Sequence, residues 1–492
     1  MLLRGAFLVS AGLGSWKTIR NSEEFKAGLY KEGLPDYTWE QIAQHKDKNE
    51  SVWVAFGDGV YDVTNFVVNH PGGEKILLGA GGSVEPYWNL YRVHHKQMVY
   101  QMLESMRVGN LKPTEKKVEL DDPYLKDPER SQNLVAFSQK PFNAETQSEI
   151  LTENFVTPNS EFFVRNHLPV PQVDPQTYRF ELSFEEGSLE FSLDYLKNNF
   201  EFVEVTTSLQ CAGNRRTGFR EHGELRGVPW TAGAIGTAVW RGIRLRDVIK
   251  SAGIDTSKYK HLHVEALDSD ANGPFGTNIP LDKAMSEEGD VILAFEMNGQ
   301  ELPRDHGYPI RLIVPGYVGK RNIKWVKKIT LSDKESELVW HARDYRIFSQ
   351  HDSLTDIDFE RALPAYEMPV TSVITEPLDS SGFDLKQEEI TLKGYAYSGG
   401  GRGIARVDVT TNGGEDWETA ELHRRPIGTN NNWTWSLWEK KVDIPDKQGF
   451  EVCVRAFDTS GNTQPENGKH IWNFRGTFNN AWHCIKLNPR NY

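Results

Sequence analysis

A short segment of the chain, Cys211 to Arg216, combines one cysteine with two adjacent arginines in the order Cys-Ala-Gly-Asn-Arg-Arg. The thiolate form of cysteine is a good nucleophile and metal ligand, and nearby positive charge favours that form. Arginine presents a planar fork of donors that suits tetrahedral oxyanions. The segment could therefore hold a soft metal ion and an anionic substrate side by side. Taken alone, it is more typical of a buried structural cysteine followed by surface arginines.

Two histidines at a fixed distance suggest a second kind of metal site. His70 opens a His-Pro-Gly-Gly turn, and His94 follows 24 residues later (94 − 70). A haem iron held by two histidines needs one on each side of the porphyrin, and a glycine-rich turn leaves space beside the ring. His95 is the rival for the second position, but spacing and register favour His94. Iron bound in this way has no open position, so it carries electrons and does not bind oxygen.

The composition is that of a globular protein with about three domains of roughly 150 residues each. The 492 residues are 38% hydrophobic and 25% charged, with a net charge of −13. This negative charge argues against nucleic-acid binding and favours a basic protein partner through electrostatic steering. The three cysteines, an odd number at positions 211, 453 and 484, predict no disulfide framework and no zinc motif.

Residues 1–33 are predicted to be a targeting leader and N-terminal extension. Residues 1–21 contain two arginines, one lysine, no acidic residue and a short apolar run from Ala6 to Leu13. Acid-poor leaders with arginines resemble mitochondrial presequences, although a secretory signal or a disordered tail would share some of these features. No stretch reaches the roughly 18 apolar residues of a membrane-spanning helix, so no integral membrane segment is expected.

The elements that position the two histidines are predicted in a first domain, residues 34–112. Thr38, with Gln41 three residues later, predicts the start of a helix. The β-rich runs 51–56 and 60–63, separated by a glycine turn, predict two strands. Residues 113–123 are charged and bounded by prolines, so we expect a flexible linker there.

The cysteine segment lies in a central domain, residues 124–368. Strands and short helices alternate irregularly in this region, which favours an α+β fold. Neither a GxGxxG loop nor a GxxxxGK[ST] loop occurs, so a dinucleotide on a Rossmann fold is not expected. Residues 369–492 contain short strands, including 390–397, 405–410 and 450–458, with a hairpin signal at 411–414. This spacing predicts a C-terminal β-sandwich of immunoglobulin type, with Cys453 as a structural core residue.

Three long motifs, at residues 162–167, 211–216 and 303–307, together resemble the sulfite oxidase family. The His-Pro-Gly-Gly turn with its distant histidine resembles the cytochrome-b5 haem domain. The match runs from about Tyr37 to the C-terminus and includes the domain order. It implies a multidomain α+β chain: a small cytochrome-b5-like haem domain, a central molybdopterin-binding catalytic domain and an immunoglobulin-like dimerisation domain.

The resemblance also assigns roles to individual residues. It implies that His70 and His94 ligate haem iron and that Cys211 ligates molybdenum. The residues that would line the anion pocket and act in catalysis, together with Cys211, are Arg165, Arg216, Trp230, Tyr345 and Arg475. The residues that would contact the molybdopterin are Phe162, Phe163, Val164, Arg165, Asn166, Asp268, His306, Arg311, Asn322, Ile323 and Lys324. Arg215 keeps a structural interpretation.

The function implied by the resemblance is oxidation of sulfite to sulfate by oxygen-atom transfer at molybdenum. Electrons would pass through haem b to cytochrome c, at the last step of sulfur amino acid breakdown, in the mitochondrial intermembrane space and in a homodimer. The chemistry of the residues agrees, because three arginines offer a permanently charged cage for a small oxyanion. Molybdenum with a pterin can pass one oxygen atom and accept two electrons.

Two alternatives differ in class. A nitrate-reductase-like molybdoprotein would share the central and sandwich domains, but in that family the haem domain follows them and a flavin domain comes next. In this sequence the haem motif comes first. A non-catalytic haem carrier or scaffold would not need the complete set of cysteine, arginines and tyrosine. We therefore expect a sulfite-oxidising enzyme.

Overall fold

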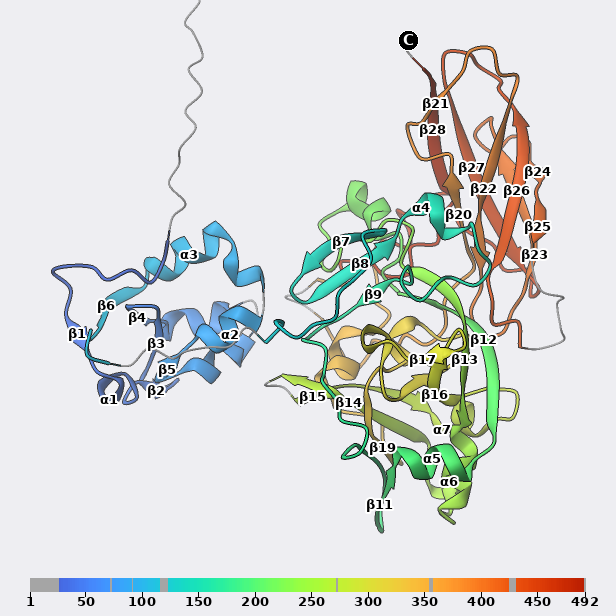
Figure 1. Cartoon of the computed structure of the whole chain (residues 1–492). Coiled ribbons are helices and arrows are strands. Elements are labelled where there is room, and N and C mark those ends of the chain that lie inside the picture. The colour runs from blue at the N-terminus through green and yellow to red at the C-terminus, as the bar shows by residue number, and fades with distance from the viewer. Residues whose placement is uncertain are drawn as a thin grey trace, which may run out of the picture. The chain divides into compact units, whose positions relative to one another are not determined.

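The computed structural model describes residues 26–70, 73–90, 92–115, 123–270, 273–353, 357–423 and 431–490. The chain divides into two compact units, Met1–Asp121 and Asp122–Tyr492 (Figure 1). Most of the predicted leader (1–33) and of the predicted linker (113–123) lies outside the described residues. Among the helices that are described, none combines the length and apolar character needed to cross a membrane.

The first unit is built on a small sheet with the strand order β1-β6-β4-β3-β2, and β5 pairs with β3. Its strands are β1 Asp36–Tyr37, β2 Lys46–Asp47, β3 Ser51–Phe56, β4 Gly59–Asp62, β5 Gly82–Ser83 and β6 Arg107–Leu111. Its α-helices are α1 Trp39–Ile42, α2 Glu85–Leu90 and α3 Gln97–Glu104, with 3-10 helices at Thr64–Asn69, Gly73–Gly79 and Arg92–His95.

The predicted start of α1 and the two predicted strands are confirmed. Thr38 accepts a hydrogen bond from the backbone N–H of Gln41 at 3.3 Å, and the Gln41 side chain accepts one from the Thr38 N–H at 2.9 Å. This reciprocal pair satisfies two of the donors that a helix start leaves free. The sheet and helices then share a core in which Val54, Trp88 and Leu103 are buried.

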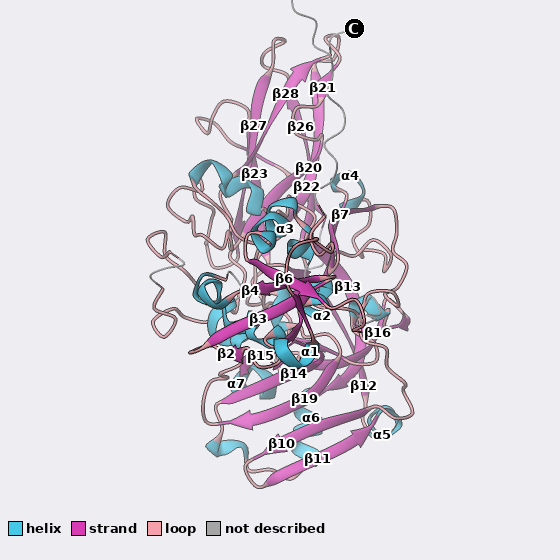
Figure 2. Cartoon of the chain, turned by 90° about the vertical axis from the view of Figure 1, so that its left-hand side faces the viewer, coloured by secondary structure: helices cyan, strands magenta, loops and turns pink. Residues whose placement is uncertain are grey.

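The central part of the second unit contains three sheets, in the orders β11-β10-β19-β14-β15, β12-β13-β16-β17 with β18 on β16, and β7-β8-β9. Their strands are β7 Leu134–Gln139, β8 Phe142–Thr146, β9 Val164–Arg165, β10 Arg179–Phe184, β11 Gly187–Ser192, β12 Phe202–Gln210, β13 Ile235–Arg244, β14 His261–Asp270, β15 Gly273–Pro280, β16 Ile292–Met297, β17 Gln300–Glu301, β18 Arg311–Ile313 and β19 Val326–Ser332. The helices are α4 Ser148–Leu151, α5 Leu193–Asn199, α6 Leu245–Ser251 and α7 Leu281–Met285. Strands dominate and short helices lie between them, as the prediction of an α+β fold requires (Figure 2).

The C-terminal part of this unit is a two-layer β-sandwich. One sheet has the order β20-β22-β26-β25 and the other β21-β28-β27-β23-β24. The strands are β20 Thr371–Glu376, β21 Gly382–Phe383, β22 Glu389–Tyr397, β23 Ile404–Thr410, β24 Glu418–Thr419, β25 Glu421–His423, β26 Ser436–Asp443, β27 Phe450–Asp458 and β28 His483–Pro489. Leu392 and Trp438 from the first sheet share a buried cluster with Val407 and Val454 from the second. The three predicted strands correspond to β22, β23 and β27, while the immunoglobulin type of the sandwich stays a prediction.

The expectation that the cysteines form no disulfide is wrong. Cys453 on β27 and Cys484 on β28 are bonded to each other, with 4.1 Å between their Cα atoms. The two strands are antiparallel, and their register sets these two residues directly opposite each other. A count of cysteines cannot reveal a pairing between strands whose partners are 31 residues apart in the sequence. Cys211 remains a free, buried cysteine.

The loop after β12 is anchored on the sandwich. Arg215 donates hydrogen bonds to the carbonyls of Ala481 at 2.6 Å and Trp482 at 3.0 Å. Asn479 donates to the Arg215 carbonyl at 2.8 Å. Arg215 itself has a left-handed backbone with φ of 62°, a conformation that these contacts hold in place. The structural interpretation of Arg215 therefore matches its position, and these contacts tie the loop that carries Cys211 to residues 479–482.

Candidate active site and histidine pair

In the first unit, His70 and His94 face each other. Their ring centroids are 6.3 Å apart and their planes differ by 14°. Bonds between imidazole nitrogen and a metal are about 2 Å long, so this spacing leaves room for one metal ion between the rings. His95 instead contacts Tyr100, with 3.0 Å between its Nδ1 and the hydroxyl. The structure therefore brings together the two predicted ligands and directs their rival elsewhere.

The protonation of His94 suits a metal ligand. Burial, helped by the neighbouring His70, lowers the pKa of His94 to about 4. The ring is therefore neutral at pH 7, which is the form that binds a metal. The Trp88 ring lies 4.9 Å from that of His94, and the Phe66 ring 5.8 Å from that of His70. A neutral His94 opposite His70, with an aromatic ring beside each, fits the iron of a haem.

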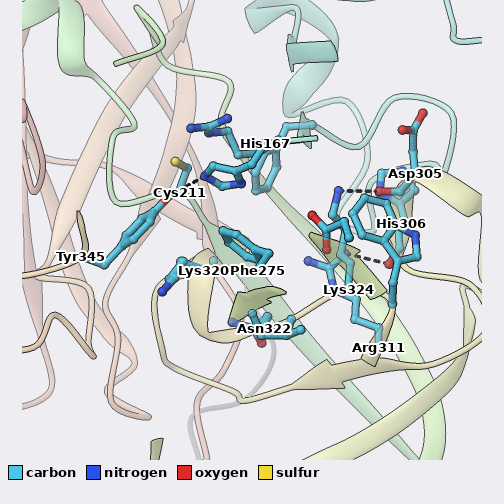
Figure 3. Close-up of a pocket in the computed structure, with 16 residues that line it drawn as sticks. His167, Cys211, Phe275, Asp305, His306, Arg311, Lys320, Asn322, Lys324 and Tyr345 are labelled. Carbon is cyan, nitrogen blue, oxygen red and sulfur yellow. Dashed lines mark hydrogen bonds between the residues drawn. The ribbon is translucent and has the colours of Figure 1, made fainter. Parts of the chain in front are cut away.

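In the second unit, a buried pocket collects residues from distant segments (Figure 3). Cys211, His167 and Tyr345 lie at one end, and His306 and Lys324 lie at the other. The predicted site residues that line it are Phe163, Arg165, Cys211, Asp268, His306, Arg311, Asn322, Ile323, Lys324 and Tyr345. Ten residues predicted from separate stretches of sequence thus share one cavity.

Six predicted residues are not on the wall of this pocket. Phe162 and Val164 line a neighbouring cavity. Asn166 is buried behind the pocket and donates a hydrogen bond to Asp305 at 2.9 Å. Trp230 is fully buried in the same apolar cluster as Cys211. The remaining two are Arg216, five residues after Cys211 in the sequence, and Arg475, whose backbone carbonyl accepts a hydrogen bond from Arg216 Nε at 2.9 Å.

Cys211 is held by its backbone at the end of β12. Its N–H donates to the Ala234 carbonyl at 2.9 Å, and its carbonyl accepts from the N–H of Asn214 at 2.9 Å. Gly319 lies close by, because a Cβ there would come within 3.1 Å of the carbonyl oxygen of Gln210. The thiol is 8% exposed and faces the pocket. Its position is therefore set by the main chain and its sulfur is available to a ligand.

Glycines surround the side chain of Arg216. A Cβ at Gly227 would lie 2.8 Å from its guanidinium carbon, and one at Gly476 would lie 2.6 Å from its Cγ. Its Nε donates to the carbonyl of Arg475 at 2.9 Å, and its Nη1 donates to the carbonyl of Val228. The missing side chains therefore create the space that lets a long cation reach a buried position.

Five predicted residues form one electrostatic group. Burial lowers the pKa of Arg216, the cations of Arg165 and Arg475 lower it further, and Cys211 and Tyr345 oppose this shift. The thiol of Cys211 therefore lies within a group of guanidinium cations. The same cations attract a small anion.

Two of the cations are oriented by polar neighbours. Arg165 donates to Asn143 Oδ1 at 3.0 Å and to the Asn166 carbonyl at 2.7 Å. Arg475 donates from Nη2 to Asp344 Oδ1 at 2.6 Å. Its buried Nε has no hydrogen-bond partner within the described residues. Arg475 therefore retains a donor for a ligand.

Tyr345 is paired with His167, a residue that the sequence motif contained but that was not predicted to act. The hydroxyl of Tyr345 and His167 Nε2 are 3.1 Å apart. The His167 ring stacks on Phe275, with 4.4 Å between centroids. Burial lowers the pKa of His167 and raises the pKa of Tyr345, so both are neutral at pH 7. A neutral hydroxyl–imidazole pair can hold or move one proton.

The opposite end of the pocket holds unsatisfied polar groups. Asp268 Oδ1 and Arg311 Nε are buried and have no hydrogen-bond partner in the described parts of the chain. Burial lowers the pKa of Arg311 to about 9 and raises the pKa of Asp268. Each such orphan costs about 1–3 kcal/mol unless a ligand satisfies it. A polar heterocycle with an anionic group, such as molybdopterin, fits this set of donors and acceptors.

Sequence reasoning missed several residues of the wall, among them Lys320. Its Nζ donates to the carbonyls of Gly276 at 2.8 Å and Trp340 at 2.7 Å. Burial lowers its pKa well below the usual value. The signal was weak: a lysine and an arginine, Lys320 and Arg321, stand in an otherwise apolar, glycine-rich run. The other residues of the wall that were not predicted are His167, Phe275, Asp305, Gly319 and Trp325.

Comparison with protein families assigns all three regions. Residues 38–112 match the cytochrome b5-like haem/steroid binding domain. Residues 167–340 match the oxidoreductase molybdopterin binding domain. Residues 362–490 match the Mo-co oxidoreductase dimerisation domain.

Individual relatives agree with these families. Human mitochondrial sulfite oxidase is 46% identical over 474 residues, covering 94% of this chain and 86% of its own. Spinach NADH nitrate reductase is more distant, at 36% identity over 73% of this chain and 41% of its own. The crystal structure of the sulfane dehydrogenase SoxCD from Paracoccus pantotrophus covers 78% of this chain and 98% of its own, with a TM-score of 0.59 and 26% identity. The identity to the human enzyme, over nearly the whole chain and in the same domain order, shows that this chain belongs to the sulfite oxidase family.

Proposed function

We propose that the chain oxidises sulfite to sulfate with molybdopterin-bound molybdenum and transfers the electrons to a b-type haem. The observation that carries this proposal is that Cys211 and Arg165 line one buried pocket and that Arg216 interacts electrostatically with both of them and with Arg475. When bound, molybdenum supplies the transfer of one oxygen atom and accepts two electrons. The family models name both cofactors, and the sulfite oxidase relatives support the reaction.

The residues around the pocket divide the work. Cys211 binds the metal as a thiolate. Arg165, Arg216 and Arg475 hold the sulfite anion through their guanidinium groups, whose planar fork of donors suits a small oxyanion. Tyr345 holds a proton at its hydroxyl oxygen, and the contact with His167 Nε2 fixes the position of that oxygen. Trp230 fills the space behind Cys211 and excludes water.

The cofactor contacts follow the polar groups at the other end. Asp268 and Arg311 offer the unsatisfied atoms, His306 and Lys324 complete the wall, and burial keeps water out of it. Phe162 to Asn166 and Asn322 to Lys324 are the two segments that would enclose the pterin and its phosphate. In the first unit, His70 and His94 would hold the iron of haem b.

The wider setting extends this proposal. The dimerisation-domain match supports a homodimer, and we infer that the sandwich that forms it is of immunoglobulin type. The names of its relatives support a mitochondrial location, for which we propose the intermembrane space. A net charge of −13 favours a basic electron acceptor, and we propose cytochrome c.

The experiment that tests this function uses the haem as its reporter. Sulfite is added to the oxidised protein without oxygen, and the absorption of the haem is followed. Reduction by sulfite, absent when nitrate or buffer is added instead, is the expected result. A protein that carries both molybdenum and haem but shows no reduction would contradict the proposal.

A further inference from the structure

Arg130, just after the predicted linker, forms a two-fold ion pair with a residue of the pocket wall. Its Nε donates to Asp305 Oδ2 at 2.7 Å, and its Nη2 donates to Asp305 Oδ1 at 3.0 Å. Nη2 also donates to Asp127 Oδ2 at 2.9 Å. The guanidinium lies 4.3 Å from the centre of the Phe142 ring. These contacts fix one geometry, because a bidentate pair restricts both partners.

Asp305 links this pair to two of the residues proposed to contact the cofactor. Its Oδ1 accepts from Asn166 Nδ2 at 2.9 Å, and its backbone carbonyl accepts from Lys324 Nζ at 3.0 Å. Lys324 Nζ also donates to Asn166 Oδ1. Figure 3 shows Asp305 and Lys324 on the side of the pocket opposite Cys211 and Tyr345. A movement of Asp305 would therefore displace both neighbours.

The charge balance points in the same direction. Burial by itself would raise the pKa of Asp305, but the hydrogen bonds and charge of Arg130, together with the charge of Lys324, lower it. Without Arg130, Lys324 would be the cation that compensates the negative charge of Asp305. The charge of Lys324 would then be neutralised inside the wall and would no longer be free for an anion in the pocket.

Arg130 also closes the pocket from behind. Asp305 and His306 line both the pocket and the neighbouring cavity, and Arg130 lines that neighbouring cavity alone. The ion pair is therefore part of the partition between the two spaces. Only 14% of the Arg130 side chain and 8% of the Asp305 side chain are exposed.

We infer that Arg130 is a positioning residue for the molybdopterin. It neutralises Asp305, which holds Asn166 and Lys324 in place, and it leaves the charge of Lys324 directed to the anionic part of the cofactor. This inference rests on the proposed function, because it assumes that this end of the pocket receives the pterin.

The test compares Arg130→Met with Arg304→Met in the full-length protein. Arg304 lines the same neighbouring cavity, but it donates to backbone carbonyls such as that of Lys126, at 2.9 Å. Molybdenum and pterin are measured per haem, because the haem in the first unit counts folded chains independently. Arg130→Met is expected to lower the ratio of pterin to haem by about tenfold or more, since an unpaired buried charge is strongly unfavourable. Arg304→Met is expected to keep the wild-type ratio.

A double variant, Arg130→Met with Asp305→Asn, separates charge from packing. It removes the unpaired carboxylate, so pterin retention is expected to recover at least severalfold over Arg130→Met. If Arg130→Met does not fold, Arg130→Lys replaces it, with a severalfold loss expected because the bidentate geometry is absent. The thermal unfolding transition of the second unit, measured on the full-length protein without cofactors, shows whether Arg130→Met is folded.

Three results would overturn the inference. These are a normal pterin ratio in the Arg130 variant, an equal loss in both arginine variants, or no recovery in the double variant. A wild-type protein without any pterin would instead refute the proposed function, and the inference with it.

Discussion

The two sites of this protein are built in opposite ways. The histidine pair comes from residues 24 positions apart (94 − 70) in one small unit: His70 directly follows the 3-10 helix Thr64–Asn69, and His94 lies in the 3-10 helix Arg92–His95. The pocket of the second unit joins Arg165, Cys211 and Tyr345, and Arg475, from the segment between β27 and β28, belongs to the same electrostatic group. One site is local in sequence, and the other depends on how several sheets are packed.

The two sites also differ in the charge of their buried groups. In the histidine pair, His94 is uncharged at pH 7, because burial lowers its pKa to about 4. The second site concentrates buried cations, and burial lowers the pKa of Arg216, Arg311 and Lys320. Such a group is tolerated only with anions nearby. The first site is therefore formed before it binds its cofactor, whereas the second is completed by what it binds.

The largest effect is expected when each site is removed in turn. Cys211→Ser should lower haem reduction by sulfite more than about 100-fold, since even outer partners of metal ligands are worth 10- to 100-fold. The spectrum of the haem should stay unchanged. His70→Ala should abolish haem binding and leave the pterin content intact. Stopped-flow absorption and pterin analysis measure the two effects, and a loss of both cofactors in either variant would break the independence of the sites.

The next effect separates the adjacent arginines of the second site. Arg216→Met should raise the KM for sulfite by about 10- to 100-fold, because hydrogen bonds to charged groups are worth 1.5–3 kcal/mol. Arg215→Met should lower the melting temperature of the second unit and leave KM unchanged. Steady-state kinetics and calorimetry distinguish the two. If both variants changed KM equally, the anion site would not be specific to Arg216.

A smaller, severalfold effect is expected from salt. Turnover with cytochrome c should fall as salt rises from about 0.01 to 0.15 M, because the screening length shortens from about 30 to 8 Å. Ferricyanide, an anionic acceptor, serves as the matched control and should respond in the opposite direction. A turnover with cytochrome c that did not respond to salt would remove electrostatic steering from the proposal.

The smallest effect, a few degrees in melting temperature, is expected from pH in the cofactor-free protein. The pKa of His94 falls from 6.5 to about 4 on folding, so the unfolded chain binds the proton more readily between these values. The first unit should therefore lose stability as the pH falls from 6.5 to 4. Burial raises the pKa of Glu145 from 4.5 to about 7. Its carboxylate accepts a hydrogen bond from the N–H of Thr231 at 3.0 Å. The second unit should lose stability as the pH rises from 4.5 to 7.

Calorimetry of His94→Leu and Glu145→Gln tests this opposition. Each variant should flatten the pH response of its own unit and leave that of the other unchanged. If the stability of both units changed in the same direction with pH in the wild-type protein, the expected difference between His94 and Glu145 would be contradicted.

Local signals in the sequence predicted local structure well. The capping residues of α1 and the strands β22, β23 and β27 were visible as patterns within a few residues. The histidine pair was recognisable for the same reason, as a turn and a spacing. The long motifs contain four of the ten predicted residues that line one pocket, and the family resemblance supplied the other six, although the roles of all ten stay predictions.

Features that depend on contacts between residues far apart in the sequence could not be predicted from it. The disulfide between Cys453 and Cys484 requires the register of β27 with β28. Arg130 becomes important only because Asp305, far along the chain, lies against it. His167 stood inside a motif, but its partner Tyr345 is supplied by another segment. In each case the missing information is which surfaces meet, and no short pattern encodes it.

The glycines around Arg216 have a consequence for inherited variation. Adding a single methyl group at Gly227 or Gly476 would occupy the space of the arginine side chain. A change that is among the mildest by chemistry would thus act as severely as the loss of a charged residue. At Gly227 and Gly476, the tolerance to mutation is set by the space that the side chain of Arg216 occupies beside them.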